Sequence, residues 1–152
     1  MNKNILIKNR LIKSSLLNEN QFSFSEEKLN KEQDGLFSFY YSLKFYNSGS
    51  ELYFYISFTE LYDKKAINSI HFWLEKVNYN GKGYRILSID DFCTINNLEN
   101  EWNRVNNFQG ITFEEKLNNL ITDFEQFVRS TDLIKVFRGE VWYDQYWINP
   151  RD

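Results

Sequence analysis

Two consecutive stretches of alternating apolar and polar residues constrain the fold of this chain more than any other feature. In the first stretch the alternate residues are Phe37, Phe39, Tyr41, Leu43 and Phe45. In the second they are Leu52, Phe54, Ile56 and Phe58. Because successive side chains of a β-strand point to opposite faces, this pattern predicts two strands with one buried face each. The short turn between them contains Gly49 and predicts a β-hairpin.

The opposite faces of these two strands carry four tyrosines, Tyr40, Tyr46, Tyr53 and Tyr55. Two interpretations of these tyrosines are open. Exposed tyrosines are large, stiff and amphipathic, and they are typical of surfaces that bind another protein. Alternatively, a helix at the N-terminus covers them and leaves nothing to bind. A stacking platform for single-stranded nucleic acid needs basic neighbours, and only Lys44 lies nearby, beside Glu51.

Further strands are predicted on both sides of this hairpin. Phe22 and Phe24 alternate with serines and predict a short strand before it. After it, one arm of a second hairpin is predicted by the alternate apolar residues Ile70, Phe72 and Leu74. Residues 80–83 contain an Asn-Gly turn, and residues 84–89 form the returning arm. The sheet therefore has four or five antiparallel strands in meander order.

Both ends of the chain show the apolar spacing of helices. Residues 3–17 predict a short amphipathic helix that carries Ile5, Leu6, Ile12, Leu16 and Leu17. A helix over residues 96–107 is predicted from Leu98, Trp102 and Val105. Thr112 and Glu115 form a capping-box sequence, which marks the start of a longer helix that reaches about residue 129. The apolar stripe of this helix consists of Phe113, Leu117, Leu120, Ile121, Phe124, Phe127 and Val128.

The end of the chain permits two descriptions. Residues 132–138 either extend the long helix or form a separate turn, and Gly139 is the predicted C-cap. Residues 141–148 form a strand or a short helix. We predict a single α+β domain over residues 1–152, because no Pro- or Gly-rich linker divides it. Its antiparallel meander sheet of four or five strands is packed on one face by the C-terminal helices, with a short N-terminal helix.

The residues that usually carry catalysis or bind metals are scarce. The chain has one histidine, His71, and one cysteine, Cys93, so a zinc site of the usual His/Cys type is excluded. No local signature supports a nucleophile–base pair between them. The adjacent acids Asp90 and Asp91 lie at a predicted strand-to-helix junction, where aspartate is a common cap. We therefore expect no catalytic residue, no metal and no cofactor.

Charge and composition favour a protein as the partner. The net charge is -3, and residues 90–132 contain nine acids and three bases. Such an acidic flank repels nucleic-acid backbones and suits a basic protein. Aromatic residues make up 18% of the chain. Since Phe, Tyr, Asn, Lys and Ile share A/T-rich codons, a biased genome explains part of this excess, and we give it no functional weight.

The sequence predicts a cytoplasmic protein. Cys93 has no second cysteine with which to form an internal disulfide. The apolar run Ile5–Ile7 is too short for a secretory signal, and no run is long enough to span a membrane. The basic, acid-free residues 1–13 also fit a mitochondrial presequence, although the single arginine among them argues against this alternative.

The favoured hypothesis is a small non-enzymatic protein that binds another protein. Its most specific form is an immunity (antitoxin-like) protein that neutralises a basic toxin domain in a bacterium. The candidate binding residues are Tyr40, Tyr46, Tyr53, Tyr55, Glu99, Glu101, Trp142 and Tyr146. The alternative is an enzyme or ligand-binding domain with a pocket between sheet and helices, which uses His71, Asp90 and Asp91. A structural or phage-associated protein is a further alternative, and the oligomeric state is open.

Overall fold

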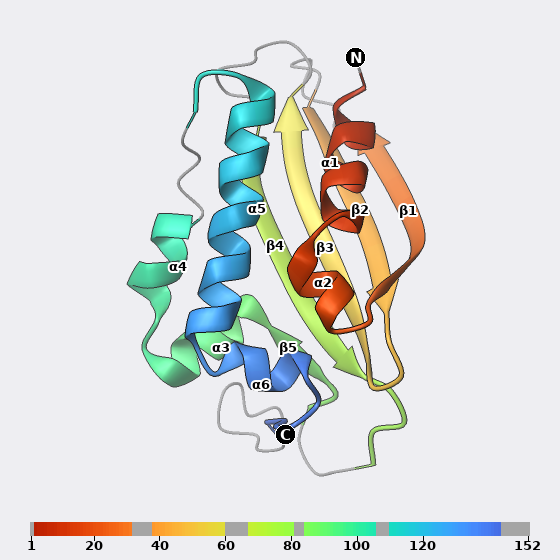
Figure 1. Ribbon diagram of the computed structural model, residues 1–152, viewed down its shortest axis with the longest axis vertical. Helices are drawn as coiled ribbons and strands as arrows, with labels where there is room; N and C mark the ends of the chain where they lie inside the picture. Colours follow the sequence, from red (N-terminus) through yellow and green to blue (C-terminus); the bar gives the residue numbers. More distant parts are fainter. Residues whose placement is uncertain (1, 32–37, 60–66, 81–83, 106–109, 144–152) are drawn as a thin grey trace.

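The sheet is antiparallel, with five strands in the order β1-β2-β3-β4-β5. The computed structural model describes residues 2–31, 38–59, 67–80, 84–105 and 110–143. The strands are β1 Ser23–Lys31, β2 Ser38–Tyr46, β3 Ser50–Thr59, β4 Ile67–Lys76 and β5 Ile86–Ser88. The helices are α1 Lys3–Ile12, α2 Ser15–Glu19, α3 Ile89–Asn96, α4 Glu99–Val105, α5 Phe113–Ser130 and α6 Leu133–Phe137. The predicted α+β meander is therefore confirmed (Figure 1).

The alternating residues form the inner face of the sheet, which packs against the helices. Leu43 of β2 lies opposite Phe54 of β3, which in turn lies opposite Phe72 of β4. All three side chains are buried. Burying one face of such strands removes a continuous apolar surface from water, which stabilises the sheet and fixes its register. Both predicted hairpins are present as antiparallel strand pairs, β2–β3 and β4–β5. Phe37 and residues 81–83 lie outside the described residues.

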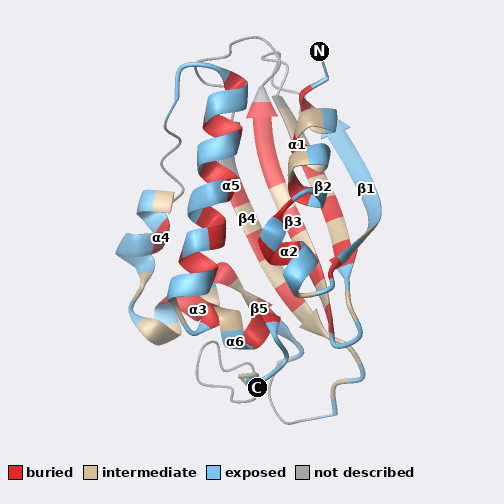
Figure 2. Cartoon of the chain, viewed as in Figure 1, coloured by how far each residue is buried: buried red, intermediate tan, exposed pale blue. Residues whose placement is uncertain are grey.

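Helix α5 covers this inner face along most of its length. Its start is the predicted capping box: the Glu115 amide donates to the Thr112 hydroxyl at 3.2 Å, and the Thr112 amide donates to the Glu115 carboxylate at 3.5 Å. Every residue of the predicted apolar stripe is buried. The Phe124 ring packs edge-on against Phe54 and Phe72, with centroids 5.5 and 5.1 Å apart. Figure 2 shows the buried stripe of α5 turned toward the sheet.

The other helices join the same core. Trp102 of α4 contacts Phe72, and so does Phe137 of α6. Phe92 of α3 contacts Phe127 of α5. Helices α1, α2 and α5 lie over one face of the sheet (Figure 1). Consequently, the face of the sheet away from these helices is not covered by any helix of the described residues.

The prediction of one N-terminal helix over residues 3–17 is wrong. The chain forms α1 and α2, and Ser14 between them adopts an extended conformation with φ −60° and ψ 123°. Its hydroxyl accepts from the Leu17 amide at 3.3 Å, so Ser14 is the N-cap of α2. Helix α1 also buries a different face from the predicted one, because Ile7 and Leu11 enter the core whereas Ile5 and Ile12 are 45% and 40% exposed.

The region after β4 also differs from the prediction. The last strand ends at Ser88, whose hydroxyl accepts from the Asp91 amide, so Ser88 is the N-cap of α3. Asp90 and Asp91 are not caps but occupy the first turn of this helix, where their charge interacts favourably with the helix dipole. The helix predicted over residues 96–107 corresponds to α4, Glu99–Val105, although residues 106 and 107 lie outside the described residues. The additional helix α3 precedes it and ends at Asn97, which has a left-handed φ of 57°.

The C-terminal part is resolved in favour of a separate helix, α6. Gly139 follows its C-cap with a φ of 75°, which glycine adopts without a steric penalty. Residues 141–143 are neither strand nor helix, and Tyr146 and Trp147 lie outside the described residues. Among the described helices, none combines the length and the apolar character needed to cross a membrane.

Candidate functional site

The candidate site is the open face of the sheet, the face that points away from α1, α2 and α5. Its defining side chains are Tyr40, Ser42, Lys44, Tyr46, Glu51, Tyr53, Tyr55, His71 and Trp73. The strand register shows that these residues lie on the same face, because residues directly opposite one another on paired strands share a face. Helix α1 packs on α5 and β1, on the inner side, so the N-terminal helix does not cover the four tyrosines. Their expected place on a shared face is correct.

The aromatic side chains of the open face stack on one another across the strands. Tyr53 and Trp73 are direct cross-strand partners, and their rings are parallel within 5° with centroids 5.0 Å apart. Tyr40 and Tyr55 stack diagonally at the same distance, 5.0 Å. The centroids of the His71 and Trp73 rings lie 5.8 Å apart. Cross-strand aromatic pairs stabilise a sheet, and each of these rings packs against another ring of the open face.

A charged pair borders the aromatic rings. Lys44 Nζ lies 2.9 Å from a Glu51 carboxylate oxygen and 5.6 Å from the centroid of the Tyr53 ring. The Tyr53 hydroxyl donates to the same carboxylate at 2.6 Å. Arg85 approaches Glu51 at 3.8 Å from the β5 side. Glu51 therefore contacts a lysine of β2, a tyrosine of its own strand β3 and an arginine that directly precedes β5.

These contacts change the protonation chemistry of the cluster. Burial, together with the hydrogen bond to Glu51, raises the pKa of Tyr53 to about 12. The bond from the Tyr53 hydroxyl, followed by that from Lys44, lowers the pKa of the Glu51 carboxyl. At neutral pH the phenol therefore remains a donor and the carboxylate remains ionised. The Tyr53 hydroxyl and the Lys44 amine therefore both meet an ionised Glu51 carboxylate at neutral pH.

A shallow groove runs over this part of the open face, with a volume of about 340 Å³. Its lining includes Glu26, Lys28, Ser42, Lys44, Tyr53 and Trp73. The lining combines the aromatic residues Tyr53 and Trp73 with acidic and basic side chains. Interfaces between proteins have this composition, with apolar and aromatic residues at the centre and charged residues at the rim.

Of the residues of the alternative enzyme hypothesis, His71 lies in β4, and Asp90 and Asp91 lie in the first turn of α3. His71 lies on the open face, and Cys93 is buried in the core on the other side of the sheet. Burial raises the pKa of the Cys93 thiol to about 12, so it is not ionised at neutral pH. His71 Nδ1 lies 3.7 Å from an Asp90 oxygen, beyond hydrogen-bond distance, and the Asp90 side chain is 75% exposed.

The other predicted binding residues lie elsewhere. Glu99 and Glu101 are exposed on α4, which packs on α5, away from the open face. Trp142 is half-buried; its indole N–H donates to the Tyr84 carbonyl at 3.1 Å and Lys76 lies over its ring. Trp142 therefore closes the β4–β5 end of the sheet. Tyr146 lies outside the described residues.

The chain matches no protein family, no curated protein sequence and no solved structure. The function must therefore be argued from the site itself. Within the described ranges, no group of three or more His, Cys, Asp or Glu side chains is placed to hold a metal ion.

Sequence reasoning found the tyrosines but missed part of the site. Trp73 was not predicted, although it lies one residue from Phe72 and must therefore face away from the core. The sequence places Glu51 beside Lys44 but does not predict its contacts with Tyr53 and Arg85. These contacts depend on the β2–β3 register, which sets Lys44 opposite Tyr53, and on the long-range approach of Arg85.

Proposed function

We propose that this chain is a small non-enzymatic protein that binds another protein through the open face of its sheet. The observation that carries this proposal is the stacked pair Tyr53–Trp73, held beside Glu51 and Lys44 on a face without a described helix. Rigid, partly exposed aromatic rings lose little side-chain entropy when a partner covers them. Such rings are the residues that most often dominate binding energy.

The charges of the open face support a protein over a nucleic acid as the partner. Lys44 is paired with Glu51, and Glu26 lies 3.8 Å from the same amine. A nucleic-acid platform needs a surplus of basic side chains around its aromatic rings to contact phosphates. Here the acids offset the bases, which suits a partner with charged groups of both signs at its rim.

The specific form of the proposal is an immunity protein that neutralises a toxin domain. The small acidic chain, the aromatic binding face and the buried, unreactive Cys93 are compatible with inhibition by occlusion, which requires no chemistry. In this form, the partner is a toxin domain encoded by the adjacent gene. The acidic flank with Glu99 and Glu101 on α4 would attract a basic partner at long range, while the open face makes the contact.

The test measures binding between the full chain and the purified protein encoded by the adjacent gene, by isothermal titration calorimetry. Replacing Trp73 or Tyr53 by alanine is expected to weaken binding by about 30-fold or more, which corresponds to about 2 kcal/mol. The matched control is a Glu99→Ala, Glu101→Ala double variant, which should slow association and leave most of the affinity intact. Unchanged affinity of the Trp73 and Tyr53 variants, or a larger loss in the control, overturns the proposed site.

A growth assay tests the immunity form separately. Cells that express the adjacent gene product as a toxin should survive when the wild-type chain is co-expressed. The Trp73→Ala variant should lose this protection at equal expression level. If the adjacent gene product is not toxic, or if the variant protects fully, the immunity proposal fails while the binding result stands on its own.

A further inference from the structure

The two edges of the sheet differ greatly in length. Edge strand β1 has nine residues, whereas β5 at the other edge has three. The register of β1 against β2 shifts once, between Phe24 and Glu26, and the following residues to Lys31 pair regularly. No strand of the described residues pairs with the outer side of β1. A long regular edge presents backbone donors and acceptors that serve as a template for another strand.

Exposed apolar side chains gather beside this edge. Leu29, in the middle of the regular part of β1, is 42% exposed on the helix side of the sheet. On α1, Ile5 and Ile12 are 45% and 40% exposed. Lys8 lies between these two isoleucines at helical spacing, so the three side chains share one stripe.

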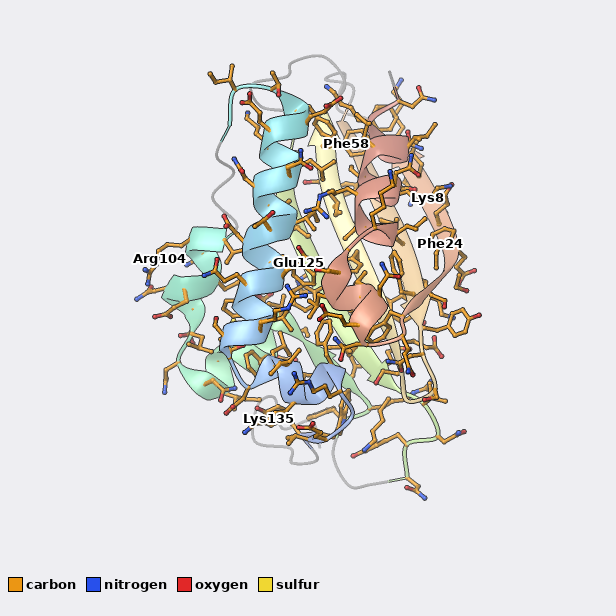
Figure 3. All side chains as sticks on the ribbon, in the orientation of Figure 1. Lys8, Phe24, Phe58, Arg104, Glu125 and Lys135 are labelled. Carbon is orange, nitrogen blue, oxygen red and sulfur yellow. The ribbon has the colours of Figure 1, made fainter. Side chains whose placement is uncertain are left out.

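The contacts of Lys8 show that this stripe of α1 faces β1. Its amine lies 3.2 Å from the Glu27 carboxylate and 5.4 Å from the centroid of the Phe24 ring, and both residues belong to β1. Figure 3 shows Lys8 and Phe24 on the same side of the molecule, at the β1 edge. The exposed residues Ile5, Ile12 and Leu29 therefore flank the same unpaired edge. These three apolar side chains are therefore available for contact with a chain that pairs with β1.

The sequence of β1 is complementary to a second copy of itself. When two β1 strands pair antiparallel about a two-fold axis at Leu29, each Glu27 faces Lys31 of the second copy, and Leu29 faces Leu29. On the opposite face, Lys28 lies across from Asn30. Axes at Lys28 or Glu27 would instead place like charges directly opposite each other, which destabilises strand pairing. An axis at Asn30 would pair Leu29 with Lys31 and bring no opposite charges of β1 together. The charges thus favour the register centred on Leu29, which pairs Glu27 with Lys31.

We propose that the chain forms a two-fold symmetric homodimer in which the β1 strands pair antiparallel about Leu29. Helix α1 of each copy flanks the axis, and Ile5 and Ile12 bury their exposed side chains against the second copy. The interface is isologous, as closed dimers require. The two sheets become one, and both open faces lie on the same side of it. This inference is independent of partner binding through the open face.

The first test measures the mass of the full chain by light scattering after size-exclusion chromatography. The wild type is expected at twice the mass of one chain. Leu29→Lys and Leu29→Glu should each be monomeric, because like charges meet at the axis. Mixing the two variants should restore a dimer, since a lysine then faces a glutamate. Ile86→Lys on β5 is the matched control, since Ile86 is an apolar residue 48% exposed at the other edge, and it should remain dimeric.

A cross-link tests the register directly. Directly opposed residues of an antiparallel pair have Cα atoms about 4.5–5.5 Å apart, within the range of a disulfide. Leu29→Cys should therefore give a covalent dimer on mild oxidation, whereas Ile86→Cys should not. The buried Cys93 does not compete. Three results would overturn the proposal. The wild type could be monomeric at its highest soluble concentration, the mixed Leu29 variants could fail to form a dimer, or Ile86→Cys could form the cross-link.

Discussion

The Glu125 carboxylate accepts a hydrogen bond from the Ser14 hydroxyl at 2.8 Å, and this contact links the longest helix to the start of α2. The same oxygen accepts from the Ser15 hydroxyl and the Leu16 amide, both at 3.2 Å. Arg10 lies 3.9 Å from the other carboxylate oxygen. Glu125 is only 7% exposed, so a buried carboxylate holds the break between α1 and α2 in place.

Replacing Glu125 by alanine is expected to lower the free energy of unfolding by about 2–3 kcal/mol. The change leaves the Ser14 hydroxyl and the Leu16 amide buried without their acceptor, and an unpaired buried polar group is costly. Urea unfolding followed by circular dichroism measures the difference. The exposed neighbour Gln126 provides the control: Gln126→Ala should change stability by less than about 0.5 kcal/mol. Equal losses in both variants would contradict the role assigned to Glu125.

The same carboxylate predicts a pH dependence. Burial opposes ionisation of Glu125, but the bonds from Ser14, Leu16 and Ser15 outweigh it and lower the pKa. A folded-state pKa below the unfolded value, about 4.3, stabilises the protein above that value. This stability is lost as the pH falls through the folded-state pKa. The difference in unfolding free energy between wild type and Glu125→Gln should therefore shrink as the pH is lowered from 6 toward about 3. A constant difference over this range would exclude the linkage.

Substituting alanine for each of three glycines is expected to change the stability of the protein by different amounts. Gly110 has a φ of +139° and a Cβ there would lie 2.8 Å from the Lys116 amide nitrogen, so Gly110→Ala should cost most. Gly139 has a φ of +75° with open space around it, and Gly139→Ala should cost about 1 kcal/mol of backbone strain. At Gly49 a Cβ meets only Asn47 Oδ1 at 3.8 Å, so stability should be unchanged or raised by up to about 1 kcal/mol. Thermal unfolding of the three variants gives the order.

The parts of the fold that were predicted correctly are those in which the local spacing of apolar residues matches a strand or a helix. Phe54 and Phe72 are buried because they follow the strand period, and Phe124 because it follows the helix period. The break at Ser14 was missed because Ile12, Leu16 and Leu17 continue a helical spacing across it. Its cause lies more than a hundred residues away, in Glu125. Local periodicity does not contain such a contact.

The open face shows the same division. The sequence places four tyrosines on one side of the strands, and the register agrees. Whether a helix covers these tyrosines depends on the face of the sheet against which α1 packs. The contact between Lys8 of α1 and Glu27 of β1 helps to fix this face, and it joins residues far apart in the sequence. The start of α3 was also not predicted, since Ile89 was assigned to the end of a strand, whereas Ser88 ends β5 and caps a helix that begins at Ile89.

Helix α3 buries Cys93, and this burial predicts a low reactivity of its thiol. Its side chain is 2% exposed, and burial raises the pKa of the thiol to about 12, so neither access nor ionisation favours attack on a disulfide reagent. In the folded protein, Cys93 should react with Ellman's reagent more than about 100-fold more slowly than in urea, because reaction requires opening of the core. The neighbouring Thr94 is exposed on the same helix. A Thr94→Cys, Cys93→Ser variant should therefore react at nearly the unfolded rate. If native Cys93 reacted as fast as that variant, α3 would not be packed as described.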